Sequence, residues 1–199
     1  MNRNTSKQEQ PIDKLNPKVA GASQSIPEKS GSATRPEDIT AVRFLEKQHV
    51  ELQGLFAQME QETTQTGRRM LLERCATFLR NHSAIEERHF YPAVLNEETE
   101  KLLKEARKEH REAEEKLGEL FQCESFDEDF VKEFDDWVEE VQHHIHEEEN
   151  ELFPMVAKEI PGSTLVRVGE EMQEAYRFMA QSGPSISDKV RTTQRNEHD

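Results

Sequence analysis

Apolar side chains recur at the spacing of a helix face from residue 37 to residue 160. Steps of three and four residues produce four separate apolar stripes in this stretch, which is nearly free of glycine and of β-branched runs. Each stripe is interrupted near its middle by a histidine, and the four histidines are His49, His82, His110 and His144. The pattern predicts an all-α domain of four helices, each with one histidine on its inward face.

The positions of the turns predict how these helices are arranged. Two residues on successive antiparallel helices lie at the same height when the turn between them falls midway along the sequence. The midpoints between successive histidines fall at residues 64–67, at Asn96 and at residues 125–127, all of which have turn-like composition. We therefore expect an up-and-down antiparallel four-helix bundle with the four histidines in one layer of its core.

Composition changes at both ends of this stretch. Residues 161–163 read Pro-Gly-Ser and break the pattern before a shorter amphipathic segment, which predicts a short fifth helix that covers the bundle or another subunit. The N-terminal segment carries four prolines and few large apolar residues, and the C-terminal segment is polar. The predicted organisation is a disordered arm at 1–36, the bundle at 37–160, the fifth helix at 161–181 and a disordered tail at 182–199.

Charge and cysteine content narrow the classes of partner. The 199 residues carry a net charge of −15, and the arm contributes +3, so the remainder carries −18. This balance argues against nucleic acid or an anionic membrane as a partner, because both require clustered basic residues. No apolar run is long enough for a membrane span, and no secretory signal is evident, so we expect a cytoplasmic protein. The widely separated Cys75 and Cys123 indicate neither a disulfide framework nor a zinc ribbon.

Two of the predicted helices end in the same motif. Residues 82–92 read HSAIEERHFYP and residues 144–154 read HIHEEENELFP, so each has a histidine, a glutamate four residues later, and an aromatic residue before a proline. Side chains at positions i and i+4 share a helix face, a spacing typical of metal ligands. A shift of 61 or 62 residues maps the first helix pair onto the second, which indicates a duplicated unit. The motif residues are His82 with Glu86 and His144 with Glu148.

Four imidazoles and two carboxylates in one layer suit two first-row metal ions. Each ion can take two histidines while both glutamates bridge, which leaves each ion short of six ligands and open to a small exogenous ligand. The alternative, a metal-free core, would contain a large unsatisfied polar cluster. Histidine and carboxylate favour iron or manganese over structural zinc. The predicted ligands are His49, His82, Glu86, His110, His144 and Glu148.

Two further residues are candidates for an outer layer around these ligands. His89 follows Glu86 by one turn, although its counterpart in the repeat is Glu151, and Glu114 follows His110 by one turn. The acidic neighbours of the two motif glutamates are expected to face solvent instead.

At these residues the sequence resembles the hemerythrin-like family, also called HHE cation-binding domains, in its bacterial four-histidine, two-glutamate form. The resemblance covers about residues 37 to 160 and implies a four-helix bundle around a non-haem di-iron site with the same six ligands. Oxygen-carrying hemerythrins have a fifth histidine one turn from that of the third helix, where this chain has Ala106 and Glu114. The resemblance thus implies the stress-related bacterial branch rather than reversible oxygen carriage.

Three functions remain open from the sequence. The leading hypothesis is a di-iron protein, not an enzyme, that binds or senses dioxygen, nitric oxide or peroxide in a stress response, with zinc or manganese as alternative metals. The rival is a di-iron enzyme that turns over peroxide or nitric oxide, or an iron donor for iron–sulfur cluster repair. The third is a metal-dependent interaction protein that binds a partner through the fifth helix.

Overall fold

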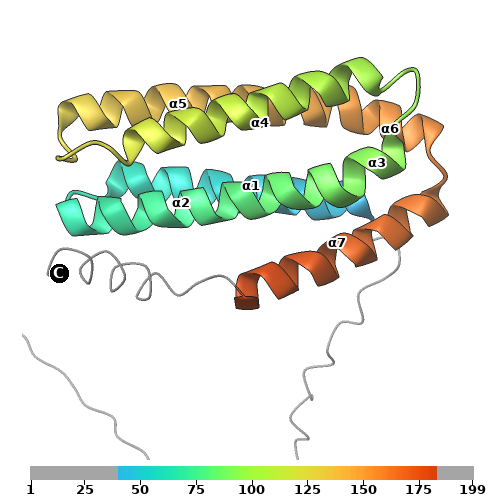
Figure 1. Cartoon of the computed structure of the whole chain (residues 1–199), viewed down its shortest axis with the longest axis horizontal. Coiled ribbons are helices and arrows are strands. Elements are labelled where there is room, and N and C mark those ends of the chain that lie inside the picture. Colours follow the sequence, from blue (N-terminus) through green and yellow to red (C-terminus); the bar gives the residue numbers. More distant parts are fainter. Residues whose placement is uncertain (1–39, 183–199) are drawn as a thin grey trace, which may run out of the picture. The chain divides into compact units, whose positions relative to one another are not determined.

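The computed structural model describes residues 40–182, and every regular element in this range is helical (Figure 1). The arm expected at residues 1–36 lies outside the described residues, as does the tail expected at 182–199 apart from its first residue. None of the described helices combines the length and apolar character needed to cross a lipid bilayer.

Four long helices form the expected up-and-down bundle. Helix α1 packs beside α2 and helix α4 beside α5, and the loops between successive helices fall where the histidine midpoints place them (Figure 1). Helices α2 and α5 each continue through one π-helical turn into a short α-helix, α3 and α6. The bounds are α1 Ala41–Gln61, α2 Gln65–Ile85, α3 Tyr91–Val94, α4 Glu100–Leu120, α5 Glu128–Glu147 and α6 Phe153–Glu159.

Side-chain caps define where three of these helices begin. The Thr40 hydroxyl accepts a hydrogen bond from the Arg43 backbone N–H, and Thr64 accepts one from Gly67. The Asp127 carboxylate accepts from the backbone N–H groups of Asp129 and Phe130. Each cap satisfies donors that have no partner inside the helix, so the polar residues between the apolar stripes fix the turns.

The apolar core consists of two clusters, one on either side of the histidine layer. One contains Phe56, Phe134 and Trp137, with the Phe56 and Trp137 rings edge to face at 5.5 Å. The other contains Leu45 and Ile85 together with residues of α3, α6 and the fifth helix. Along α1 and α2 the two histidines fall between these clusters, so the polar layer is closed above and below by packed apolar side chains.

The fifth helix, α7, spans Gly162–Ser182 and covers the bundle. Its bounds nearly match the 161–181 expected from the sequence, and its 21 residues make it as long as α1. It packs on α1 and α2 (Figure 1), and its buried Val168 and Met172 belong to the same apolar cluster as Leu45 and Ile85. Tyr176 lies edge to face against Phe44 at 6.0 Å and Phe78 at 6.2 Å. Helix α7 therefore shields the α1–α2 side of the bundle.

The two cysteines are expected to differ sharply in reactivity. Cys75 is fully buried, and burial raises the pKa of its thiol to about 12, whereas Cys123 is partly exposed near Glu133. Because the thiolate is the reactive form, an alkylating reagent at pH 8 should modify Cys75 at least ~100-fold more slowly than Cys123 in the native chain. Mass spectrometry of Cys75→Ser and Cys123→Ser variants assigns the sites. Equal modification rates in the native chain would contradict this packing.

Candidate metal centre

The structure brings the four predicted histidines and two predicted glutamates together in one buried layer. All six side chains are at most 6% exposed. They fall into two groups whose potential ligand atoms lie within 4.8 Å of one another, and Glu86 belongs to both groups. We call this set the histidine–glutamate layer; its members are His49, His82, Glu86, His110, His144 and Glu148.

The histidines form two pairs. The first pair, His49 from α1 and His82 from α2, has ring centroids 5.1 Å apart. The second pair, His110 from α4 and His144 from α5, has ring centroids 4.7 Å apart and Nε2 atoms 3.1 Å apart. Each pair thus offers two inward nitrogen atoms to one position, as the internal repeat predicts.

The two carboxylates connect the pairs. Glu86 Oε2 lies 3.3 Å from His82 Nε2 and 3.2 Å from His110 Nε2. Glu148 Oε2 lies 3.4 Å from His49 Nε2 and 3.7 Å from His144 Nε2. Each glutamate therefore contacts one histidine of each pair, which is the arrangement that two bridging carboxylates require.

Most of the inward-facing atoms have no hydrogen-bond partner. Among the described residues, six buried side-chain nitrogen and oxygen atoms lack a partner, and five of them belong to this layer: His49 Nε2, His82 Nε2, both oxygens of Glu86, and Glu148 Oε2. An unpaired buried polar atom costs free energy, and a carboxylate costs more than an amide. These nitrogen and oxygen atoms are good donors to first-row metal ions, so the residues present fit a bound metal pair.

The charge states of the layer show why positive charge is needed inside it. Burial and the neighbouring Glu148 raise the pKa of Glu86 well above its ordinary value. Burial opposes ionisation of Glu148 as well, but His144 and His49 outweigh it and lower the pKa of this carboxyl. Burial and the charge of His49 hold the pKa of His82 well below 6.5. Without added cations, only one of the two glutamates is readily ionised.

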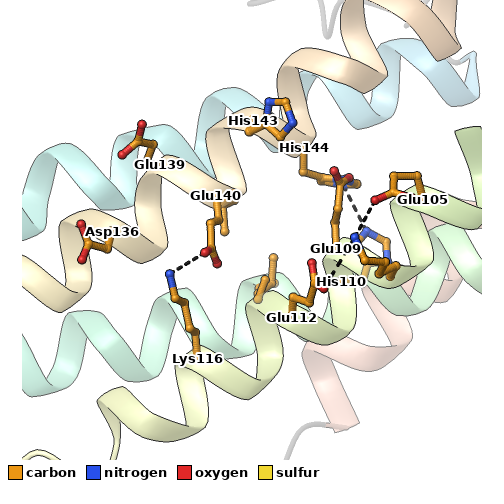
Figure 2. Close-up of a pocket in the computed structure, with 14 residues that line it drawn as sticks. Glu105, Glu109, His110, Glu112, Lys116, Asp136, Glu139, Glu140, His143 and His144 are labelled. Atoms are coloured by element: carbon orange, nitrogen blue, oxygen red, sulfur yellow. Dashed lines mark hydrogen bonds and ion pairs between the residues drawn. The ribbon is translucent and has the colours of Figure 1, made fainter.

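Each histidine uses its outward nitrogen to hold an outer partner. Each Nδ1 lies 2.8 to 3.0 Å from an acceptor oxygen, and donation from Nδ1–H directs Nε2 inward, where it can bind a metal ion in place of a proton. Figure 2 shows one of these bonds, from His144 to Glu109. The four bonds are His49 to Glu149, His82 to Gln48, His110 to Glu87, and His144 to Glu109.

These outer partners differ from the two residues that the sequence predicted around the ligands. Glu114, predicted for this role, is exposed and pairs with Arg80 at 2.9 Å, and His89 forms no hydrogen bond with the layer in the described part of the chain. Glu87 and Glu149 are exposed, as expected, but each also accepts a hydrogen bond from a histidine of the layer. The sequence contains a pattern that could have identified the outer partners. Each of them directly precedes a histidine or directly follows a glutamate of the layer, and the internal repeat relates them in pairs.

A tyrosine was missed in the same way. Tyr91 is buried, and its hydroxyl donates to Glu148 Oε1 at 3.1 Å and lies 3.5 Å from His110 Nε2. Burial and the nearby carboxylates, Glu148 first, raise its pKa well above 10, so the hydroxyl keeps its proton. The repeat places Phe153 at the equivalent position, stacked on His49 at 5.9 Å. The two pairs therefore have different aromatic neighbours, one of which can donate a proton.

Both glutamates of the layer begin a π-helical turn. The Tyr91 N–H bonds to the carbonyl of Glu86 and the Phe153 N–H to that of Glu148, each five residues back. A proline follows each turn, and its ring would clash with the carbonyl four residues earlier in a regular helix. The wider turn removes this clash at the two places where carboxylates enter the core.

A surface pocket of about 600 Å³ lies between α4 and α5 and reaches the second pair (Figure 2). His110 and His144 line its floor, and most of its other polar lining is carboxylate. No residue of the first pair lines this pocket. A small molecule can thus approach the second pair more directly than the first.

The chain was compared with known proteins. A family model described as the hemerythrin HHE cation-binding domain matches residues 40–156, more than half of the chain. A crystal structure of a hemerythrin HHE cation-binding domain-containing protein from Mycobacterium kansasii is similar to this chain, with a TM-score of 0.65 and 24% sequence identity. The match covers 72% of this chain and 88% of that chain, and at this identity it shows the fold alone. The comparison with curated proteins finds no match.

Proposed function

This chain belongs to the hemerythrin HHE cation-binding family, and from that membership we propose that it is a non-haem di-iron protein that binds or senses dioxygen, nitric oxide or peroxide in a stress response. The observation that carries the proposal is the set of five buried, unpartnered donor atoms in the histidine–glutamate layer. Zinc and manganese are the alternative metals, because imidazole and carboxylate also suit them.

In this proposal each histidine pair would hold one ion, and Glu86 and Glu148 would supply carboxylate ligands to the centre. Iron, when bound, supplies the electrons and the open coordination positions that capture of a small oxidant requires. The four imidazoles are held in place by their outer partners, so the nitrogen ligands of the layer are preorganised.

The protein groups around the layer favour one direction of approach. In the first pair both imidazoles are covered by a ring, Phe153 on His49 and Phe78 on His82 at 6.4 Å, whereas in the second pair Tyr91 stacks on His110. The second pair faces the surface pocket and has the Tyr91 hydroxyl beside it. A diatomic ligand or peroxide would therefore enter at the second pair, where Tyr91 can donate a hydrogen bond.

The deciding experiment exposes reduced, iron-loaded protein to dioxygen, nitric oxide or peroxide under controlled conditions and follows absorbance. An optical change that reverses when the gas is removed supports a binding or sensing role. Sustained consumption of the oxidant with a supplied reductant identifies the rival, an enzyme. If no ligand changes the spectrum of iron-loaded protein, the redox proposal is wrong and the metal is structural.

Replacing Tyr91 by phenylalanine should slow the reaction with dioxygen without removing metal. The variant loses the only hydroxyl hydrogen-bonded to Glu148 in the described residues, and a hydrogen bond to a charged group contributes roughly 1.5 to 3 kcal/mol, so we expect a decrease of at least about tenfold. Stopped-flow absorbance measures the rate, and metal analysis checks the stoichiometry. Tyr176→Phe is the matched control, since Tyr176 lies on α7 outside the layer. Equal rates in both variants would contradict a role for Tyr91.

A further inference from the structure

The two histidine pairs are related by the internal repeat, but their surroundings differ at one buried position. The repeat maps Gln48 onto Glu109, and each side chain accepts a hydrogen bond from the outer nitrogen of a histidine on the neighbouring helix. Building on the proposed metal pair, we propose that Gln48 makes the position between His49 and His82 the weaker of the two, so that the centre fills in a fixed order.

His82 has an amide as its outer partner, whereas each of the other three histidines has a carboxylate. Gln48 Oε1 lies 3.0 Å from His82 Nδ1, and the residue is 3% exposed. Its Nε2 has no hydrogen-bond partner in the described part of the chain. Gln48 is therefore the one outer partner of the four histidines that carries no charge.

The chemical difference lies in how strongly each partner polarises its imidazole. A carboxylate that accepts the Nδ1–H bond raises the electron density, and so the ligand strength, of Nε2. A neutral amide oxygen does this less, and loss of an outer partner typically lowers metal affinity by about 10- to 100-fold. We therefore expect the first pair to bind its ion about tenfold more weakly than the second.

Outside the six proposed ligands, the charges around the two pairs act in the same direction. The second pair has two outer carboxylates, Glu87 and Glu109, and the first pair has only Glu149. Glu109 is also the better buried of these, with 15% of its side chain exposed against 38% for Glu149. Less screening by water strengthens its attraction for a cation, which again favours the second pair.

Ordered filling has a consequence for the proposed function. At limiting metal the chain would hold one ion at the second pair, beside the surface pocket and Tyr91. The two-metal centre would form only when metal is abundant enough to fill the first pair. The response of the protein to a small oxidant would then depend on the supply of metal as well.

The first test isolates each position with single variants of the full chain. His82→Ala removes one ligand of the first pair and His144→Ala one ligand of the second. Titration of metal-free protein with Co²⁺, followed by calorimetry and absorbance, should show one tight site in His82→Ala and a site about tenfold weaker in His144→Ala. Equal affinities, or the opposite order, would overturn the inference.

The second test exchanges the outer partners and leaves all six ligands in place. Gln48→Glu should strengthen the weaker of the two Co²⁺ binding steps by about tenfold, and Glu109→Gln should weaken the tighter step by a similar factor. Repulsion between two bound ions also makes the affinities of the two steps differ. It does not predict that Gln48→Glu strengthens one step while Glu109→Gln weakens the other. Glu109 is partly exposed, so its variant tests the inference even if the buried Gln48→Glu variant folds poorly, which circular dichroism reports. If neither Co²⁺ binding step changes in Glu109→Gln, ordered filling is refuted but the proposed metal centre is not. A wild-type chain that binds neither Co²⁺ nor iron would refute the metal centre itself.

Discussion

Two iron ions per chain are expected in the wild-type protein and none in the double variant His82→Ala, His144→Ala. The double variant removes one imidazole from each pair, so neither position retains two nitrogen ligands. The remaining ligands are one histidine per position and the two shared glutamates. Anaerobic reconstitution with ferrous iron, desalting and elemental analysis measure the stoichiometry.

The matched control for this experiment is the double variant His143→Ala, His146→Ala. Both histidines are exposed on α5, on either side of His144, so the control removes the same number of imidazoles as the test variant. It also removes one member of a surface group in which His143 lies near Glu109 and Glu147. The control should retain two ions. Loss of iron from the control, or its retention by the first variant, would assign binding to the surface instead of the core.

Removal of the metal is expected to lower the thermal stability of the chain by on the order of 10 °C. A ligand that binds only the folded state adds about 4.1 kcal/mol at a thousandfold excess over its dissociation constant, and each kcal/mol corresponds to a few degrees in a domain of this size. The physical cause is the set of donor atoms that are buried without partners when no cation is present. Thermal denaturation followed by circular dichroism, with and without metal, measures the difference.

The double variant of the histidine pairs also serves as the control for stability. It should melt at one temperature regardless of added metal, because it has no complete position to fill. A wild-type chain that melts equally with and without stoichiometric metal would show that the layer is stable on its own. The same measurement with Zn²⁺ and Mn²⁺ ranks the alternative metals.

The amino-acid sequence was sufficient to predict the bundle and the histidine–glutamate layer. The rise per residue of an α-helix is constant, so the height of a residue on an antiparallel helix follows from its distance to the turn. Numbering alone therefore placed His49, His82, His110 and His144 at one level, and the i, i+4 spacing added Glu86 and Glu148. The repeat provided a second, independent indication of the same set.

Other features depended on how the helices pack. Glu87 is adjacent to Glu86 in sequence but bonds to His110 on another helix, and Gln48 bonds to His82 rather than to its own neighbour. Such contacts depend on the rotation of each helix about its axis and on the distance to the next helix. The spacing of apolar residues along the sequence defines both quantities only coarsely. The same limit applies to Glu114, which the sequence placed near the layer and packing directs to Arg80.

For the two π-helical turns and helix α7 as well, the sequence predicts part of the structure and packing decides the rest. Each motif proline predicts that the regular α-helix is interrupted. Whether the helix ends, kinks or widens into a π-helical turn there depends on the packing around Glu86 and Glu148. The amphipathic pattern after residue 161 likewise predicts a helix but does not name the surface it covers. Thus local periodicity and spacing determined the helices and the inward residues of this protein. The contacts between helices decided the outer partners, the position of Tyr91 and the difference between the two histidine pairs, because these contacts arise only when side chains from distant segments pack together.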